Sequence, residues 1–415
     1  MSLAAILAVA VLLLLPGGLM LLVPWSLRPF LSLAFWIASW WWLPRLGPGR
    51  TPFLHGAILA FALLGLTRFL KPIQLRRPSL PTSLVGLAMA LTFLGPSLAS
   101  RLLPAEAAFD ALTARLLVAR DGIPETYEPL LPVRAFGLRP PGFASLAADI
   151  GLLAGASPRQ ALPVTAGAAQ ALLLLAAFRL SRRSLAGVPA ALAAIGFGLV
   201  ASALGVLPAG AVLGLALALV AAPHLGVGPK APAVAAGVFL GASILCGGIP
   251  VAALVLAIGI TTALRLPSPA RLLAVQRLGL ASATACLLVA PAVLRVGAST
   301  FSRPSLGAVA GAGVRSLERW PDAHDRAASA WLESHTAPLD LICAENTPAA
   351  AWIPALAGRA VLLDGRMGPV PTGLQALPPA RPCRLLYRSG PWETGVPVLF
   401  RSGPITIVEA PNPRP

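Results

Sequence analysis

Charged residues are scarce in this sequence, and acidic residues are the scarcest of all. Of 415 residues only 11% are charged, whereas 57% are hydrophobic and the mean hydropathy is +0.80. A soluble domain of this composition would aggregate, which excludes an ordinary globular protein in water. The sequence therefore predicts that lipid is the solvent for much of the chain.

The few acidic residues avoid the long apolar runs. Six of the 15 lie between residues 104 and 160: Glu106, Asp110, Asp121, Glu125, Glu128 and Asp149. The other nine all follow Arg315. Transporters usually carry ionisable side chains in mid-membrane, so this distribution counts against a transporter or flippase-like protein, which stays as an alternative.

Cysteine is also rare, and its spacing does not suggest a metal site. The four cysteines include no CxxC pair, so we expect no zinc or iron-sulfur centre and no cofactor. Cys343 and Cys383 could form a disulfide if the C-terminal tail is extracytoplasmic. They could equally be two separate buried thiols, because separation in sequence does not fix geometry.

The formal net charge of +17 invites comparison with nucleic-acid-binding proteins. The arginines, however, stand singly or in twos and threes between apolar runs, and no basic face or stacking platform accompanies them. They are typical of membrane topology signals. We therefore expect membrane lipids as partners and no nucleic acid.

Apolar runs of a length that crosses a bilayer, about 17 to 25 residues, recur from Leu3 to Leu294. They predict about ten transmembrane helices, the first of them retained because it lacks a basic n-region and a cleavage site. A tryptophan cluster at 36 and 40–42 is typical of an aromatic belt at the membrane surface. The predicted spans cover 3–23, 30–42, 52–70, 83–103, 160–178, 185–204, 205–222, 231–246, 250–264 and 278–294.

Basic residues predict the orientation of these spans. Arg179, Arg182 and Arg183 directly follow the span 160–178 and mark a cytoplasmic end. Counting crossings from there places the acidic segment and the tail outside, with Arg45 and Arg50 as exceptions. Inside the acidic segment, the apolar stretch 143–153 is short and predicts an interfacial helix lying on the bilayer.

The tail predicts a small α/β domain. A helical pattern covers 321–335, and short apolar runs at 339–343, 360–363, 383–387 and 398–400 predict strands. His324 with Asp322 and Asp325 fits a solvated helix start better than a metal site or triad. The predicted organisation is 1–103 N-terminal transmembrane helices, 104–159 extracytoplasmic acidic loop, 160–296 transmembrane helices and 297–415 extracytoplasmic domain.

Chemistry on a lipid-linked substrate needs reactive groups at the water boundary, and the acidic loop is the segment that offers them. Asp110 follows the fourth predicted span and could act as a general base. Glu106 lies one turn earlier on the same face if the helix continues. Arg134 and Arg139 could hold a phosphate by charge-assisted hydrogen bonds. The alternative is that these acids are merely solvated and the arginines meet lipid headgroups.

This region resembles the first loop of the GT-C membrane glycosyltransferases, which include protein mannosyltransferases and aminoarabinose lipid A transferases. The segments that carry the resemblance are 109–115 (FDALTAR), 121–124 (DGIP), 139–143 (RPPGF), 153–157 (LAGAS) and 179–183 (RLSRR). A weaker likeness links 331–338 and 352–359 to the extracytoplasmic C-terminal domains of bacterial members.

The resemblance implies a GT-C-like fold in a bacterial inner or plasma membrane. It implies transfer of a sugar from a polyprenyl-phosphate donor to a lipid, glycan or protein acceptor on the extracytoplasmic face. Asp110 matches the family's catalytic or metal-linked carboxylate. The candidates are therefore Asp110 and Glu106 for catalysis, and Arg134, Arg139 and Tyr127 for substrate binding.

Three departures from the family pattern keep a second hypothesis open. About four spans precede the loop, the external turn near 203–208 has no carboxylate, and Thr113 and Ala114 replace the usual tyrosine or histidine. A catalytically silent membrane scaffold of the same fold is therefore the main alternative.

Overall fold

The structure, a computed structural model, describes most of the chain. The described residues are 3–19, 23–45, 49–69, 79–98, 107–131, 136, 141–184, 188–189, 191–193, 195–196, 209–225, 230–247, 249–296, 321–345, 348–363, 366–368, 382–390 and 396–410.

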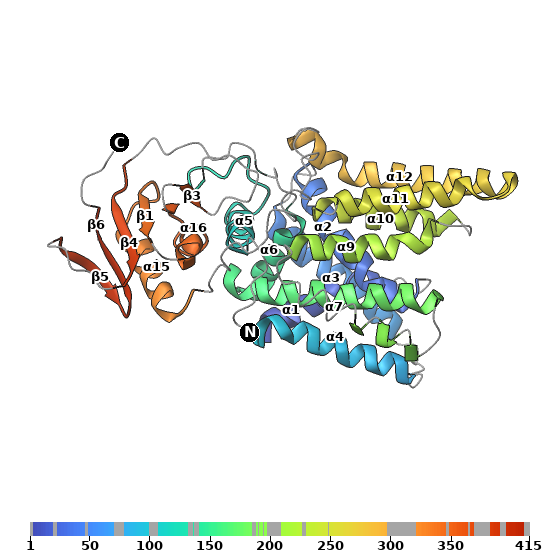
Figure 1. Ribbon diagram of the computed structural model, residues 1–415, viewed down its shortest axis with the longest axis horizontal. Helices are drawn as coiled ribbons and strands as arrows, with labels where there is room; N and C mark the ends of the chain where they lie inside the picture. The colour runs from blue at the N-terminus through green and yellow to red at the C-terminus, as the bar shows by residue number, and fades with distance from the viewer. Residues whose placement is uncertain are drawn as a thin grey trace.

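A block of helices makes up the larger part of the molecule (Figure 1). Most of its helices coincide with predicted spans, and the predicted span 185–204 lies largely outside the described residues. The helices are α1 Leu3–Leu14, α2 Arg28–Trp42, α3 Arg50–Phe69, α4 Leu80–Leu98, α5 Ala107–Arg120, α6 Gly142–Ala154, α7 Pro158–Ser184, α9 Ala209–Ala221, α10 Lys230–Leu245, α11 Ile249–Leu264 and α12 Ser268–Val296.

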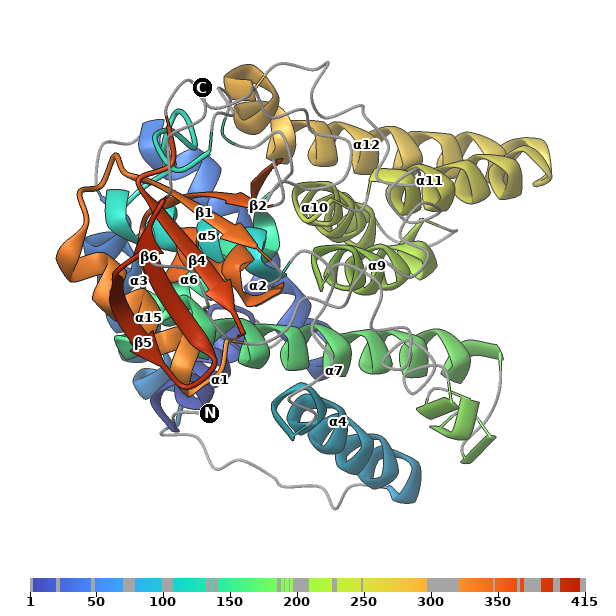
Figure 2. The same ribbon diagram turned by 60° about the vertical axis from the view of Figure 1, so that its left-hand side comes forward.

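A small sheet with two helices forms the other end of the molecule, as the sequence predicted for the tail (Figure 2). Its strand order is β3-β2-β1-β4-β6-β5, with β1 parallel to β2 and β4 and the other pairs antiparallel. The sequence missed β3 and β6. The elements are α15 Ala323–His335, β1 Leu341–Glu345, α16 Ile353–Leu356, β2 Ala360–Leu363, β3 Arg366–Gly368, β4 Leu385–Ser389, β5 Val398–Ser402 and β6 Ile405–Glu409.

Two helices of the described part are long and apolar enough to cross a membrane. They cover Gln160–Arg182 in α7 and Ser268–Leu294 in α12. The other apolar helices are shorter.

The first predicted span, 3–23, is wrong as one continuous helix, because α1 ends at Leu14. Pro16 cannot continue a helix, and the chain turns back at Gly17. A β-carbon on Gly17 would lie 2.0 Å from the carbonyl oxygen of Arg28. The Gly17 amide instead donates to Ser32 Oγ at 2.9 Å, which fastens the turn to α2.

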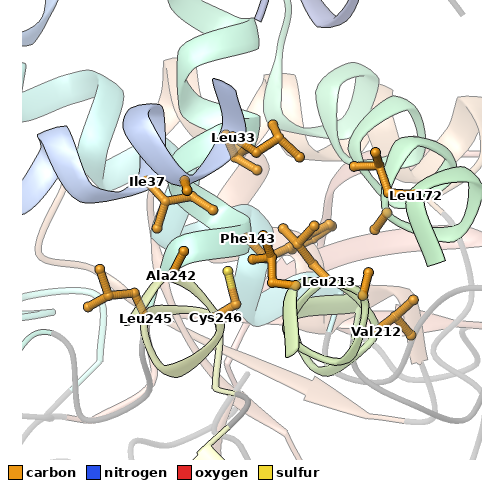
Figure 3. Packing of buried hydrophobic residues seen from close by; sticks show 14 of the residues in the cluster. Leu33, Ile37, Phe143, Leu172, Val212, Leu213, Ala242, Leu245 and Cys246 are labelled. Atoms are coloured by element: carbon orange, nitrogen blue, oxygen red, sulfur yellow. The ribbon is translucent and has the colours of Figure 1, made fainter. Parts of the chain in front are cut away.

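Helix α6 was expected on the bilayer surface, and this prediction is also wrong. All residues from Gly142 to Ile150 are buried by protein, against α1, α2, α5, α7 and α9. Phe143 lies between Leu213 of α9 and Leu33 and Ile37 of α2 (Figure 3). α6 is thus a core helix of the block, and it ends at Gly155, whose backbone is left-handed.

A buried ion pair joins α6 to the start of α3. The guanidinium of Arg50 donates to both carboxylate oxygens of Asp149, from Nε at 2.8 Å and from Nη2 at 2.6 Å. The Arg50 side chain is 1% exposed and that of Asp149 is fully buried. Arg50 also donates to Ser39 Oγ at 2.7 Å and to the carbonyl of Trp36 at 3.2 Å. The charges are therefore paired and hydrogen-bonded, as burial of ions requires.

The tryptophans of α2 surround this pair, so the predicted aromatic belt is wrong for three of the four. Trp36, Trp40 and Trp41 are buried, and only Trp42 is exposed. The Arg50 guanidinium lies 4.5 Å from the ring centre of Trp40, a cation–π distance. Trp40 Nε1 donates to Asp149 Oδ1 at 3.1 Å. The N–H groups of Trp36 and Trp40 thus find acceptors inside the protein.

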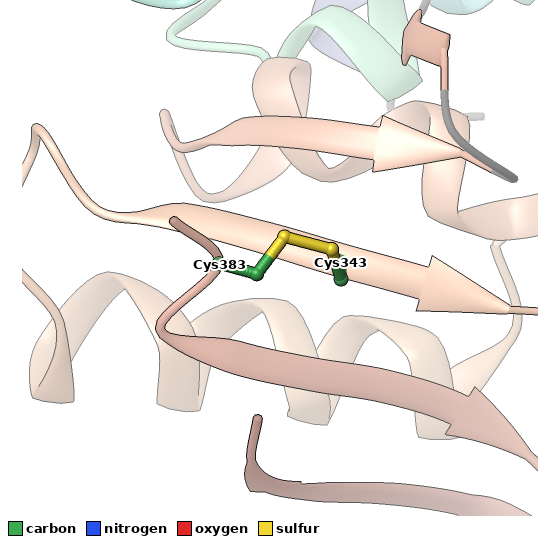
Figure 4. The surroundings of a disulfide bond; sticks show 2 residues. All are labelled: Cys343 and Cys383. Carbon is green, nitrogen blue, oxygen red and sulfur yellow. A yellow bond between two sulfur atoms is a disulfide. The ribbon is translucent and has the colours of Figure 1, made fainter. Parts of the chain in front are cut away.

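Cys343 of β1 and Cys383 form a disulfide across the sheet (Figure 4). Their Cα atoms are 5.6 Å apart, within the range that a disulfide bridges. The structure thus decides between the two alternatives that the sequence left open.

A helix starts after Asp322, as the sequence indicated, and a capping box closes its first turn. Asp322 accepts from the amides of His324 and Asp325, and the Asp325 carboxylate accepts from the Asp322 amide. The expectation that Asp325 is solvated is wrong, because its side chain is buried and accepts a hydrogen bond from Tyr387 Oη at 2.7 Å. His335 is the last residue of the helix.

The buried pair predicts a large stability difference between two carboxylate substitutions. We expect Asp149→Asn to lower the free energy of unfolding by about 3 to 5 kcal/mol, because it leaves Arg50 buried without its counter-ion. Asp340→Asn, which breaks the surface pair Arg384–Asp340, should lower it by less than about 1 kcal/mol. Thermal unfolding in detergent measures both, and equal losses would contradict the role given to the pair.

Candidate functional site

Asp110 lies in the first turn of α5, a helix that the sequence did not separate from the fourth span. Its side chain is only 6% exposed, and the residues on either side, Phe109 and Ala111, are buried as well. A carboxylate in the first turn is stabilised by the positive end of the helix dipole. Asp110 is thus a largely enclosed carboxylate at the start of a short helix.

Helix α5 lies between the two parts of the molecule. Along the long axis, the sheet is followed by α16 and α5, then by α6 and the rest of the block (Figure 1). α5 contacts α6 and α7 on one side and α16 on the other. The candidate carboxylate therefore stands on the element that connects the helical block with the sheet domain.

Tyr127, a predicted substrate-binding residue, packs beside this helix. It is fully buried, and its ring stacks on Phe136 at 4.6 Å and lies 5.2 Å from that of Phe109. Its hydroxyl is 3.4 Å from Thr113 Oγ1, which itself donates to the carbonyl of Phe109. Tyr127 therefore supports the turn of α5 that carries Asp110.

The other three predicted site residues are not placed. Glu106, Arg134 and Arg139 lie outside the described residues, so their roles remain predictions.

A pocket of about 140 Å³ opens between α5 and α6. Small side chains line it, among them Ala114 and Ala119 of α5 and Ala147 and Gly151 of α6, with Arg115 as its cationic member. Asp110 lies one turn before Ala114 on the same helix face, because residues four apart are neighbours. The volume is below that of pockets for drug-sized ligands.

Arg115 fastens the sheet domain to α5, a role that the sequence did not reveal. Its Nη1 donates to the carbonyls of Ala355 and Leu356 at 3.0 and 2.5 Å. These carbonyls lie in the last turn of α16, where a helix leaves its acceptors unsatisfied. Arg115 Nη2 also pairs with Glu333 at 3.0 Å, but both side chains are part-exposed and this pair adds little.

Gly358 fits this contact closely. Its φ is +65°, a conformation that favours glycine. A β-carbon there would lie 2.9 Å from Arg115 Nη2. The position therefore accepts only a residue without a side chain while Arg115 keeps its place.

Arg359 completes the junction within the sheet domain. It donates from Nε to Thr336 Oγ1 at 2.7 Å and from Nη2 to the carbonyls of Glu333 and Thr336 at 2.8 and 2.6 Å. Burial lowers the pKa of its guanidinium, Glu333 acts in the opposite direction, and nearby Arg115 lowers it further. Arg359 thus joins the end of α15 to the segment that Arg115 holds.

Among the residues that the structure describes, no group of three or more His, Cys, Asp or Glu side chains could hold a metal ion.

No protein-family model, curated protein or solved structure matches this chain.

The Arg115 contact predicts that its loss loosens the junction. We expect Arg115→Ala to speed deuterium exchange in α5 and in 353–363 by about ten-fold, because hydrogen bonds to a charged group contribute about 1.5 to 3 kcal/mol. Exchange in α12 should not change. Arg115→Lys should restore only part of the protection, since one ammonium cannot reproduce a planar fork.

The matched control is Arg326→Ala, which removes an exposed arginine from α15. Equal exchange rates in the Arg115→Ala variant and in this control would show that Arg115 does not hold the domains together.

Proposed function

We propose that the chain is a polytopic membrane protein and a GT-C-like glycosyltransferase. In this proposal a sugar passes from a polyprenyl-phosphate donor to an acceptor hydroxyl on the extracytoplasmic face. The observation that carries the catalytic part is the enclosed carboxylate of Asp110 at the start of α5, between the helical block and the sheet domain.

Exposed apolar side chains support the membrane part of the proposal. Large ones occur on α1, α3, α4, α11 and α12, for example Leu7, Leu63, Leu91, Ile258 and Leu287. In the most apolar window of α12 only 28% of residues are buried. Exposed large apolar side chains on several helices support a non-aqueous environment for the block. Several apolar helices are shorter than a helix that crosses a bilayer. In this proposal they pack beside the longer helices within the membrane.

The sidedness of the molecule supports an extracytoplasmic sheet domain. Disulfides persist in oxidising compartments, and the sheet domain contains one. The C-terminal end of α7, with Arg182, lies at the end of the block away from the sheet (Figure 1). Basic residues mark the cytoplasmic side, so the two features agree.

The proposed step assigns a proton transfer to Asp110. Its carboxylate would take the proton of the acceptor hydroxyl as that oxygen bonds to the anomeric carbon of the sugar. The bond to the donor phosphate would break, and polyprenyl phosphate would leave with the electron pair. Arg134 and Arg139 are the candidates to hold the departing phosphate by charge-assisted hydrogen bonds.

One observation favours the second candidate, a silent scaffold of the same fold. Asp110 is nearly closed off, and the adjacent pocket is small and lined largely by alanine. An active transferase would need this region to open for donor and acceptor, as many enzymes do on a microsecond to millisecond timescale.

The proposal predicts that Asp110→Asn removes transfer. With polyprenyl-phosphate sugars and purified protein in lipid, the rate should fall by about 100-fold or more, because the amide cannot accept the proton. Asp340→Asn, an acidic residue of the sheet domain paired with Arg384, should leave the rate unchanged.

Three outcomes separate the candidates. Loss of transfer in Asp110→Asn alone, with an unchanged size-exclusion profile, supports Asp110 as the base. Full activity in that variant overturns the site but keeps the enzyme. No transfer by the wild type with any donor of this class overturns the enzyme in favour of the scaffold.

The sidedness predicts where the cysteines react. In intact cells, a membrane-impermeant maleimide should label the protein only after an impermeant reductant opens Cys343–Cys383. The Cys343→Ala/Cys383→Ala variant should stay unlabelled. Labelling that appears only after the cells are permeabilised would place the sheet domain in the cytoplasm.

A further inference from the structure

The hairpin of α11 and α12 projects at the end of the block away from the sheet domain (Figures 1 and 2). The two helices pack on each other, and a short turn from Arg265 to Pro267 joins them. This end of the molecule takes no part in the candidate site around α5.

The outer surface of the hairpin is largely apolar. On α12 the exposed leucines recur at every seventh position, at Leu273, Leu280, Leu287 and Leu294, with exposed fractions of 46, 37, 63 and 72%. A spacing of seven keeps residues on one side of a helix. α11 adds exposed Leu254 and Ile258. The surface is therefore an apolar stripe, in which Gln276 is an exposed polar side chain between Leu273 and Leu280.

The threonine hydroxyls on this surface are satisfied within their own helices. The hydroxyls of Thr261 and Thr262 donate to the carbonyl of Ile258 at 3.0 and 2.7 Å, and that of Thr284 donates to Leu280 at 2.8 Å. In hydrocarbon every polar group needs such an internal partner. Acyl chains are thus the occupant that this surface fits.

Two exposed arginines stand where the stripe ends. Arg265 directly follows the last residue of α11, and Arg271 lies in the first turn of α12. Arg271 Nε donates to the carbonyl of Leu266 at 3.2 Å, which uses one of the five N–H donors of a guanidinium. The sequence has no Asp or Glu from residue 249 to 296, so both charges face a surface without acidic side chains.

We infer that Arg265 and Arg271 form a binding site for the phosphate headgroup of an anionic phospholipid, whose acyl chains lie along the leucine stripe. The inference rests on the proposed membrane placement. A phospholipid joins an anionic headgroup to apolar acyl chains. Cationic side chains that lie at the end of an apolar surface therefore match both parts of the lipid. If the sheet domain is extracytoplasmic, the site lies in the cytoplasmic leaflet, whose surface is anionic.

The test uses the full chain in nanodiscs of mixed phosphatidylcholine and phosphatidylglycerol, with native mass spectrometry of the lipids that stay bound. The wild type should retain phosphatidylglycerol in excess of its share in the bilayer. Arg265→Gln/Arg271→Gln should reduce this enrichment by about five-fold or more, since each basic side chain near an anionic surface contributes about that factor. Arg265→Lys/Arg271→Lys should keep most of it, because charge is retained.

The matched control is Arg326→Gln/Arg401→Gln, which removes two exposed arginines from the sheet domain. An equal loss in this control, or unchanged enrichment in Arg265→Gln/Arg271→Gln, would overturn the site. If the wild type and the variants still insert into the nanodisc in either case, the proposed membrane placement is unaffected. Failure of the wild type to insert would overturn the placement and the lipid site together.

Discussion

The arrangement of the helical block depends on the buried pair Arg50–Asp149. Removing two charges from water is costly, and a pair deep in protein is tolerated only when every polar group finds a partner. Here the carboxylate receives both arms of the guanidinium and the Trp40 indole, while Arg50 also binds Ser39 and the Trp36 carbonyl. Any shift of α2, α3 or α6 would leave one of these groups unsatisfied. The pair therefore fixes α6 inside the block, and α6 is the surface on which α5 packs.

A second polar contact ties the other end of α5 to the same helix start. Asp121 follows α5 directly and has a positive φ of 47°. Its carboxylate accepts from the amide and the hydroxyl of Thr51 at 2.7 and 2.5 Å, and so satisfies the first turn of α3. Arg115 binds the sheet domain on the other side of α5. Helix α5 is therefore held by α3, α6 and the sheet domain. A candidate catalytic carboxylate gains from such a support, because its geometry is then set by rigid elements.

Hydropathy and turn residues predicted where most helices lie. Short apolar runs predicted four of the strands, and Asp322 with Asp325 indicated the start of α15. They could not predict what depends on pairing distant segments. Arg50 stood out as an exception to the charge rule and Asp149 as an acid within an apolar run, yet their 99-residue separation hid the pair. The tryptophans were expected at the membrane surface because a sequence does not show that a buried guanidinium will pack against their rings. α5 was missed as a separate helix because its boundary lies close to the end of an apolar span. The disulfide needed the strand register that brings Cys343 beside the start of β4.

The central claim is that the helical block lies in a bilayer with α12 facing lipid. The most direct measurement is collision accessibility of spin labels placed one at a time at Leu273, Leu280, Leu287 and Leu294 in reconstituted bilayers. The claim predicts that oxygen, which partitions into lipid, collides frequently with labels along the stripe. A water-soluble nickel complex should not reach the two central positions, Leu280 and Leu287. High accessibility of those two positions to the nickel complex, with little effect of oxygen, would contradict it.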